Sequence, residues 1–205
     1  MEASVRPAQH RAMRAFIFLA LVVDFSLSQT APTVVGAIVD SNHFGSSKGL
    51  AVDGNYAYAA GSNQDKINVV DISTPASPSR IASTPADSTN MNYPAAISVP
   101  VGGSHAIVVS EISMTLSVVD ISTPGSPSVL GHVAGTAIQA NSGNELMKGA
   151  WGVHAVGTYA YVASYQGNSL TIVDFSTPTS PTIVGSISDG YVREDEARTV
   201  RTLEL

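Results

Sequence analysis

The chain of 205 residues contains no cysteine, and only 13% of its residues are charged. The absence of cysteine excludes a disulfide-stapled scaffold, thiolate zinc sites and cysteine nucleophiles. Charged residues make up about a quarter of an ordinary domain, so this low share excludes a charged disordered tail or a coiled coil as the main body. The formal net charge is −6, which argues against nucleic acid as a partner.

The N-terminus has the composition of a secretory signal peptide. Three arginines precede the short apolar run 15–23, and the small residues Ser26 and Ser28 follow it. Nine apolar residues are too few to cross a bilayer, which needs about 20. We therefore expect residues 1–28 to be a signal peptide, the protein to be secreted or at the cell surface, and the mature chain to have no membrane span. A buried strand or an uncleaved anchor is the alternative, and translation could start at Met1 or Met13.

The rest of the chain is built from three copies of one unit. Near-identical segments of ten residues read VVDISTPASP, VVDISTPGSP and IVDFSTPTSP, at 69–78, 118–127 and 172–181. Spacings of 49 and 103 residues relate the first copy to the second and third, both at the hairpin glycine and at the aspartate. The unit is therefore free of gaps from the glycine through the aspartate, and length varies only in the connection between units, as in repeat architectures.

Each unit reads as four short strands rich in valine, isoleucine, tyrosine and threonine. In the first unit these are 49–53, 55–60, 66–72 and 79–83. The Ser-Thr-Pro-x-Ser-Pro segment lacks two backbone donors, so it predicts a rigid turn between the third and fourth strands. The aspartate before this turn is expected to accept hydrogen bonds from turn amides, with metal ligation as the alternative. The three aspartates are Asp71, Asp120 and Asp174.

These motifs resemble the LVIVD-repeat family of β-propeller proteins. The resemblance covers about residues 31–189, and the middle copy departs from it where Ser104-His105-Ala106-Ile107 replaces Asn-Tyr-Ala-Tyr. It implies an all-β fold of about three four-stranded antiparallel blades, usually at or outside the cell surface, with binding roles and no shared catalytic site. The expected blades lie at 49–83, 98–133 and 152–187, with an extra outer strand at 32–39.

A propeller closes with four to eight blades, so three predict an open, incomplete array. Its bare end faces would favour self-association, unless the chain is a fragment of a longer propeller. The repeats are expected to span residues 29–190. The charged segment 191–205 that follows them is expected to be a helical or disordered tail.

The variable connections and the loops between second and third strands are expected to emerge on one face, which is the candidate binding face. Its amides and aromatics suit a glycan or a peptide segment of a protein. The candidate residues are His43, Phe44, Lys48, Asn63, Asp65, Asn92, Tyr93, Glu111, Asn144, Glu145, Lys148, Trp151, Tyr165 and Gln166. Alternatively, these are ordinary polar loop residues with no binding role. For Trp151 the alternative is that it packs in the core near the axis of the array.

No catalytic constellation is evident, and no cofactor or metal is predicted. The histidines do not have the spacing of a zinc helix, and no G-x-S-x-G motif occurs. A Ca²⁺ site formed by Asp40, Asp87, Glu111 and Glu145 is a minor alternative. The sequence therefore favours a non-catalytic binding scaffold, with an extracellular propeller hydrolase or lyase, or an inactive fragment, as alternatives. An enzyme would bring at least two titratable groups within hydrogen-bond reach in the central funnel.

Overall fold

The structure is a computed structural model, and it describes residues 32–136 and 145–188. Residues 34–205 form one compact unit, which carries every described strand. Residues 1–33 form the other unit, of which only residues 32 and 33 are described. The predicted signal peptide and the charged tail lie outside the described residues.

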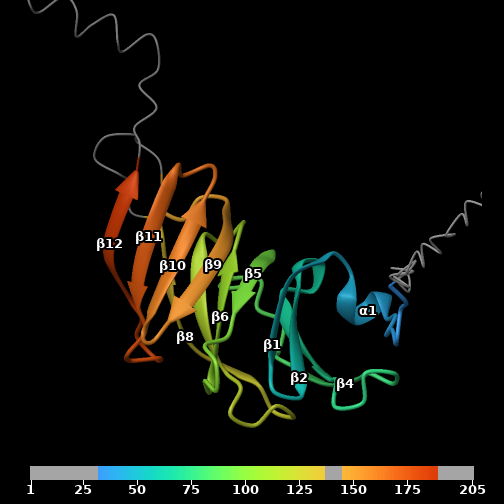
Figure 1. The fold of residues 1–205 in the computed structure, drawn as a ribbon. Helices are drawn as coiled ribbons and strands as arrows, with labels where there is room; N and C mark the ends of the chain where they lie inside the picture. The colour runs from blue at the N-terminus through green and yellow to red at the C-terminus, as the bar shows by residue number, and fades with distance from the viewer. Residues whose placement is uncertain (1–31, 137–144, 189–205) are drawn as a thin grey trace, which may run out of the picture. The chain divides into compact units, whose positions relative to one another are not determined.

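Three four-stranded antiparallel sheets, here called blades 1, 2 and 3, make up the described fold (Figure 1). Each is a meander in which consecutive strands are neighbours. Blade 1 contains β1 (Ser47–Asp53), β2 (Tyr56–Gly61), β3 (Lys66–Asp71) and β4 (Ser79–Ser83). Blade 2 contains β5 (Pro94–Ser98), β6 (His105–Ser110), β7 (Thr115–Asp120) and β8 (Ser128–Ala134). Blade 3 contains β9 (Ala150–Val156), β10 (Tyr159–Ser164), β11 (Ser169–Asp174) and β12 (Thr182–Ser188).

The blades follow one another through their first strands. The inner strand β1 lies against β5, and β5 lies against β9, while β4, β8 and β12 form the outer edges. Two short helical turns, α1 (Ser41–Phe44) and η1 (Ser62–Gln64), complete the described elements. The three blades do not close a ring, because within the described ranges no fourth blade joins blade 3 to blade 1. The prediction of an open all-β array is confirmed.

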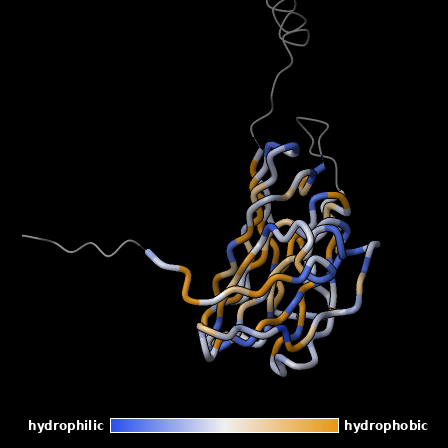
Figure 2. The backbone as a smooth tube through the Cα atoms, turned by 90° about the vertical axis from the view of Figure 1, so that its right-hand side faces the viewer, coloured by the Kyte–Doolittle hydropathy of each residue, from blue (hydrophilic) through white to orange (hydrophobic). Residues whose placement is uncertain are grey.

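Blade 2 is buried on both faces, which accounts for its near-continuous apolar strands. Ala106 and Val108 of β6 belong to the core between blades 1 and 2. Ile107 and Val109 of the same strand belong to the core between blades 2 and 3. Successive strand residues point to opposite faces, so a strand between two sheets must be apolar at every position. Figure 2 shows the hydrophobic and hydrophilic stretches that alternate along the chain.

The Ser-Thr-Pro turns have the same hydrogen bonds in all three blades. The Oδ1 atoms of Asp71, Asp120 and Asp174 each accept a 2.8 Å hydrogen bond from the amide two residues later. Hydrogen bonds from the Ser73 hydroxyl and amide lower the pKa of Asp71, and those from Ser122 lower the pKa of Asp120. The predicted capping role of these aspartates is confirmed.

The inner strand of blade 2 differs from the prediction. The repeat pattern predicts that this blade begins at residue 98, whereas β5 spans Pro94–Ser98 and ends where the prediction begins. Pro100 has no amide hydrogen to donate to a ladder, and its carbonyl instead accepts a hydrogen bond from Gly103 in a turn. The hairpin from β5 to β6 is therefore longer than the loop between Asp53 and Tyr56.

The extra outer strand predicted at 32–39 is not formed. Residues 32–40 have no regular secondary structure, and each of the three sheets already has four strands from its own repeat. A strand needs a ladder partner, and this segment pairs with none of the described strands. The segment instead passes the turn after β3, where a side chain on Gly36 would lie 2.1 Å from the carbonyl oxygen of Pro75.

Candidate functional site

Each inner strand begins with an irregularity in its ladder. In β5 the pairs Pro94↔Ser110 and Ala96↔Val109 leave Ala95 without an opposite residue. Trp151 has the same place in β9, and Lys48 lies in the corresponding irregular stretch of β1. Such β-bulges turn a side chain away from the regular alternation of the strand. The three blades therefore present Lys48, Ala95 and Trp151 at equivalent positions.

These three residues line an open pocket of about 380 Å³. Ala95 is buried, whereas Trp151 is 54% exposed. The exposure of Trp151 excludes the alternative that it packs in the core. The pocket therefore joins one residue from each blade at the starts of the inner strands.

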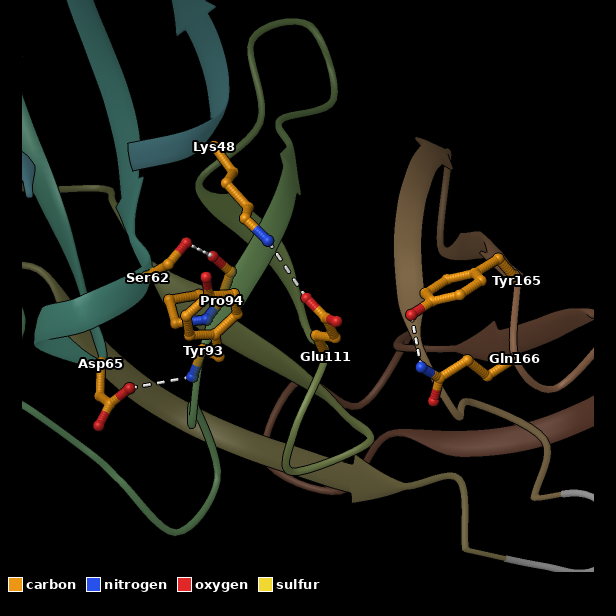
Figure 3. A network of polar contacts seen from close by, with 8 residues as sticks. All are labelled: Lys48, Ser62, Asp65, Tyr93, Pro94, Glu111, Tyr165 and Gln166. Carbon is orange, nitrogen blue, oxygen red and sulfur yellow. Dashed lines mark hydrogen bonds and ion pairs between the residues drawn. The ribbon is translucent and has the colours of Figure 1, made fainter. Parts of the chain in front are cut away.

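Lys48 connects the three blades at this pocket. Its Nζ donates a hydrogen bond of 3.2 Å to Oε2 of Glu111, in the loop after β6 (Figure 3). The same Nζ lies 4.3 Å from the ring centroid of Tyr93 and 4.8 Å from that of Trp151. Cations are attracted to aromatic ring faces at such distances. One ammonium thus contacts a carboxylate and two rings from blades 2 and 3.

Trp151 and Tyr165 form an exposed aromatic wall beside this ammonium. Their ring centroids are 5.1 Å apart with planes inclined by 53°, and Tyr165 is 53% exposed. The Tyr165 hydroxyl accepts a hydrogen bond from Nε2 of Gln166. Gly149 has a φ of +62°, and a Cβ there would lie 2.7 Å from the Tyr165 ring. Only glycine at position 149 therefore fits this backbone conformation and this position of the Tyr165 ring.

Tyr93 is held in an uncommon backbone conformation. Its φ is +60°, which is costly for a residue with a bulky side chain. Its amide donates a 2.9 Å hydrogen bond to Oδ1 of Asp65, and the Ser62 hydroxyl donates 2.7 Å to the carbonyl of Pro94 (Figure 3). Two loop residues of blade 1 therefore fix the segment that places the Tyr93 ring under Lys48. Strained backbone of this kind is frequent at functional sites.

The connections and the loops between second and third strands meet on one rim, as predicted. The Asp87 amide donates to the Asp65 carbonyl, the Glu111 amide to that of Tyr93, and the Tyr165 amide to that of Gly149. We call this surface the binding rim, after the candidate binding face that the sequence predicts. It comprises the loops 62–65, 111–114 and 165–168 and the residues that begin each inner strand or directly precede it. Of the predicted residues, it brings together Lys48, Tyr93, Glu111, Trp151, Tyr165 and Gln166, with Asp65 as a backbone support.

The other predicted residues have local contacts. The Nδ1 of His43 pairs with the Asp40 carboxylate within the α1 turn, and Asn63 donates a hydrogen bond to Ser46. Burial opposes ionisation of Asp40, but hydrogen bonds from His43 and the Asn42 amide outweigh it and lower the Asp40 pKa. The Asn92 carbonyl accepts from loop amides, Phe44 lies at the end of α1, and Lys148 pairs with Glu145 at 3.7 Å. Asn144 lies outside the described residues.

The four carboxylates of the alternative Ca²⁺ site do not form a metal-binding group in the described residues. Asp87 caps Thr89 and Asn90, and these hydrogen bonds lower its pKa against the opposing effect of burial. Glu111 and Glu145 are each paired with a lysine. In the part of the chain that the structure describes, no group of three His, Asp or Glu side chains could hold a metal ion.

Sequence reasoning missed the equivalence of the bulged residues. The offsets of 49 and 103 relate the hairpin glycines and the residues after them. Lys48, Ala95 and Trp151 precede these glycines, and the hairpin between is longer in blade 2. Aligning the blades from the residue before each inner strand reveals it. Ser46, Tyr93 and Gly149 all have positive φ and mark that position in each repeat.

The comparison with family models agrees with this architecture. The model of the LVIVD repeat matches residues 44–84, 96–134 and 148–189, one match for each blade. The chain belongs to the LVIVD repeat family. No match was found among curated proteins.

Solved structures resemble the LVIVD array at low sequence identity. A protein from Lactobacillus plantarum is 18% identical with a TM-score of 0.56, over 69% of this chain and 41% of that one. Hydrazine synthase from Kuenenia stuttgartiensis is 18% identical with a TM-score of 0.54, over 77% and 40%. A periplasmic gluconolactonase from Pseudomonas aeruginosa is 11% identical with a TM-score of 0.53, over 70% and 40%. The matched part spans about 40% of these chains, and the likeness shows a propeller-type fold.

Among the described helices, none has both the length and the apolar character needed to cross a membrane.

Proposed function

We propose that this protein is a non-catalytic binding scaffold that recognises its ligand through the binding rim. The observation that carries the proposal is the convergence of Lys48, Tyr93, Glu111, Trp151 and Tyr165, which come from three repeats. Loops on a rigid scaffold are where binding residues concentrate. Exposed tryptophan and tyrosine provide large contact areas with little loss of side-chain entropy.

A glycan or a peptide segment of a protein is the ligand class that this chemistry favours. The half-exposed faces of Trp151 and Tyr165 offer apolar contact, and Gln166 adds an amide beside them. The Lys48–Glu111 pair places a donor and an acceptor at the edge of the same wall. A site with both charges and exposed rings suits a polar ligand with apolar patches better than a highly charged polymer.

The composition of residues 1–28 supports secretion, so we place this binding at or outside the cell surface. N-terminal sequencing of protein recovered from the culture medium tests this proposal. A mature chain that begins at Gln29 is the expected result. Protein that stays in the cells with its first residues intact would contradict secretion without touching the binding proposal.

Glycan and peptide arrays, followed by titration calorimetry of the best binder, test the binding function. We expect Trp151→Ala and Tyr165→Ala each to weaken binding at least tenfold. Val101→Ala is the control, because Val101 is fully exposed in the hairpin after β5, outside the binding rim. Equal binding by all three variants would refute the rim as the recognition surface.

An extracellular enzyme on the same scaffold is the second candidate. Lys48, which lines the pocket, and Glu111 are two titratable groups within hydrogen-bond distance, and an enzyme is expected to hold such a pair in its central funnel. Among the folds with the same architecture, the Pseudomonas protein is named a gluconolactonase. However, the Nζ of Lys48 is held by Glu111 and lies over two ring faces, and these contacts suit a group that holds a polar ligand. Mass spectrometry of the bound ligand after incubation distinguishes the candidates, because turnover that Glu111→Gln abolishes would favour the enzyme.

A further inference from the structure

The binding rim combines exposed aromatic rings with an ion pair at one pocket. Trp151 and Tyr165 are about half exposed, and the Nζ of Lys48 lies 4.8 Å from the Trp151 ring centroid. The same Nζ lies 3.2 Å from Oε2 of Glu111. Figure 3 shows the Tyr165 hydroxyl pointing toward the Lys48–Glu111 pair. A ligand seated on the rings would therefore also reach an ammonium and a carboxylate.

The size of the pocket limits what it can hold. Its volume of about 380 Å³ is near the small end of ligand sites, which span about 300–1,000 Å³. Ala95 contributes only a methyl group at the position where the other two blades have lysine and tryptophan. The pocket therefore suits one compact unit of a ligand.

The ion pair sets the hydrogen-bonding character of that unit. The side chains of Lys48 and Glu111 are partly exposed, so a ligand that covers the rings displaces water from them. An ammonium only donates hydrogen bonds and an ionised carboxylate only accepts them, whereas a hydroxyl does both. A polar group that loses water without gaining a partner weakens binding. Neighbouring hydroxyls on one ligand would satisfy both side chains.

The charges around the pocket are paired. Lys48 is paired with Glu111, and Lys148, in the connection before β9, is paired with Glu145 at 3.7 Å. These four side chains have no excess charge of either sign. Charged ligands are recognised by a complementary potential, which two such pairs do not provide. The pocket therefore favours an uncharged ligand.

We propose, building on the proposed function, that the ligand is a neutral saccharide. One sugar ring would lie against Trp151, and its neighbouring hydroxyls would bind Lys48 and Glu111. The C–H bonds on a sugar ring face are slightly positive, so they are attracted to the negative face of an aromatic ring. A proline-rich peptide also docks on aromatic side chains, but proline has no amide hydrogen and offers Glu111 no donor.

Fluorescence of the full chain tests this proposal directly, because Trp151 is the single tryptophan in the sequence. The probes are neutral oligosaccharides of glucose, galactose, mannose and N-acetylglucosamine. We expect at least one of them to give a saturable change in Trp151 fluorescence, and sialylated or sulfated counterparts to bind no more tightly. Absence of any fluorescence change and of any heat in calorimetry across the panel would overturn the proposal, as would tighter binding of the charged probes.

Variants of the ion pair test how the saccharide is held. Lys48→Met and Glu111→Gln should each weaken binding about tenfold or more, because each removes a charged hydrogen-bonding partner. Two controls should bind like the unmodified chain. Arg80→Met removes a charge from the outer strand β4, and Tyr159→Ala removes a 43% exposed ring at the end of β10 opposite the rim. Equal binding by all four variants would overturn the role of the ion pair.

Trp151→Ala, measured by calorimetry, separates this proposal from the proposed function. A peptide that binds the unmodified chain but not Trp151→Ala, with no saccharide bound, would overturn the saccharide and leave the binding rim in place. Saccharide binding that neither Trp151→Ala nor Glu111→Gln weakens would place the sugar elsewhere and overturn both. Loss of saccharide binding in both variants is the expected result.

Discussion

The Nζ of Lys48 and Oε2 of Glu111 lie 3.2 Å apart although 63 positions separate the two residues in the chain. Lys48 begins the inner strand of blade 1, and Glu111 lies in a loop of blade 2. The pair therefore joins neighbouring blades at their common rim. Its side chains are 34% and 20% exposed, so water screens part of the attraction.

The pair is predicted to contribute little to stability. A double-mutant cycle with Lys48→Met and Glu111→Gln should give a coupling energy of about 0.2–1 kcal/mol, the range for exposed ion pairs. Lys48→Met alone removes two cation–π contacts as well, at about 0.5–1 kcal/mol each for exposed sites. Urea denaturation of the four proteins measures both quantities. A coupling energy above 2 kcal/mol would mean that the pair is a structural element rather than part of a binding surface.

Gly49 and Gly152 occupy equivalent positions in β1 and β9 but have different neighbours. A side chain on Gly49 would lie 2.8 Å from Cα of Ala96 in the next inner strand, whereas one on Gly152 would meet only the Ala163 side chain at 3.5 Å. We predict that Gly49→Ala destabilises the protein by about 1–3 kcal/mol through overpacking. Gly152→Ala should be neutral or slightly stabilising, since it reduces the freedom of the unfolded chain. Thermal melts compare the two, and equal losses would contradict the close approach of β1 and β5.

The sequence was informative where the repeat copies agree. The spacing from Asp71 to Asp120 and Asp174 correctly places three identical turns, because each aspartate makes its hydrogen bond within two residues. It did not place β5, because Pro100 has no amide hydrogen for the ladder and lies in a turn, a local effect that the average of the repeats hides. It also could not show that Lys48 reaches Tyr93 and Trp151, since contacts between blades depend on how the sheets stack.

Asn168 ends the loop between β10 and β11 with a φ of +48°. Asp65 and Met114 hold the same conformation in the other two blades. We predict that Asn168→Gly leaves stability nearly unchanged, whereas Asn168→Val costs about 1–2 kcal/mol because a branched side chain opposes the left-handed conformation. Chemical denaturation gives both values. If valine were tolerated as well as glycine, this loop would have to adopt another conformation.

The capping aspartates predict loss of stability in acid. Hydrogen bonds from Ser73 and Ser122 lower the pKa of Asp71 and Asp120 below the ordinary value of 3.8. A folded-state pKa below the unfolded value stabilises the protein above the unfolded pKa, and this contribution is lost as the pH falls through the folded pKa. The denaturation midpoint should therefore fall as the pH is lowered from about 4. In the double variant Asp71→Asn with Asp120→Asn, that part of the decline should disappear, and an unchanged pH profile would show that other groups cause it.

The bulges at Lys48, Ala95 and Trp151 separate two demands on the same strands. The regular positions of the strands satisfy packing between blades, while a single irregular position in each supplies the chemistry of the rim. Lysine, alanine and tryptophan occupy equivalent places on one scaffold without changing its architecture. A substitution at this one position of a repeat can therefore change the surface of the rim while the packing between blades stays the same.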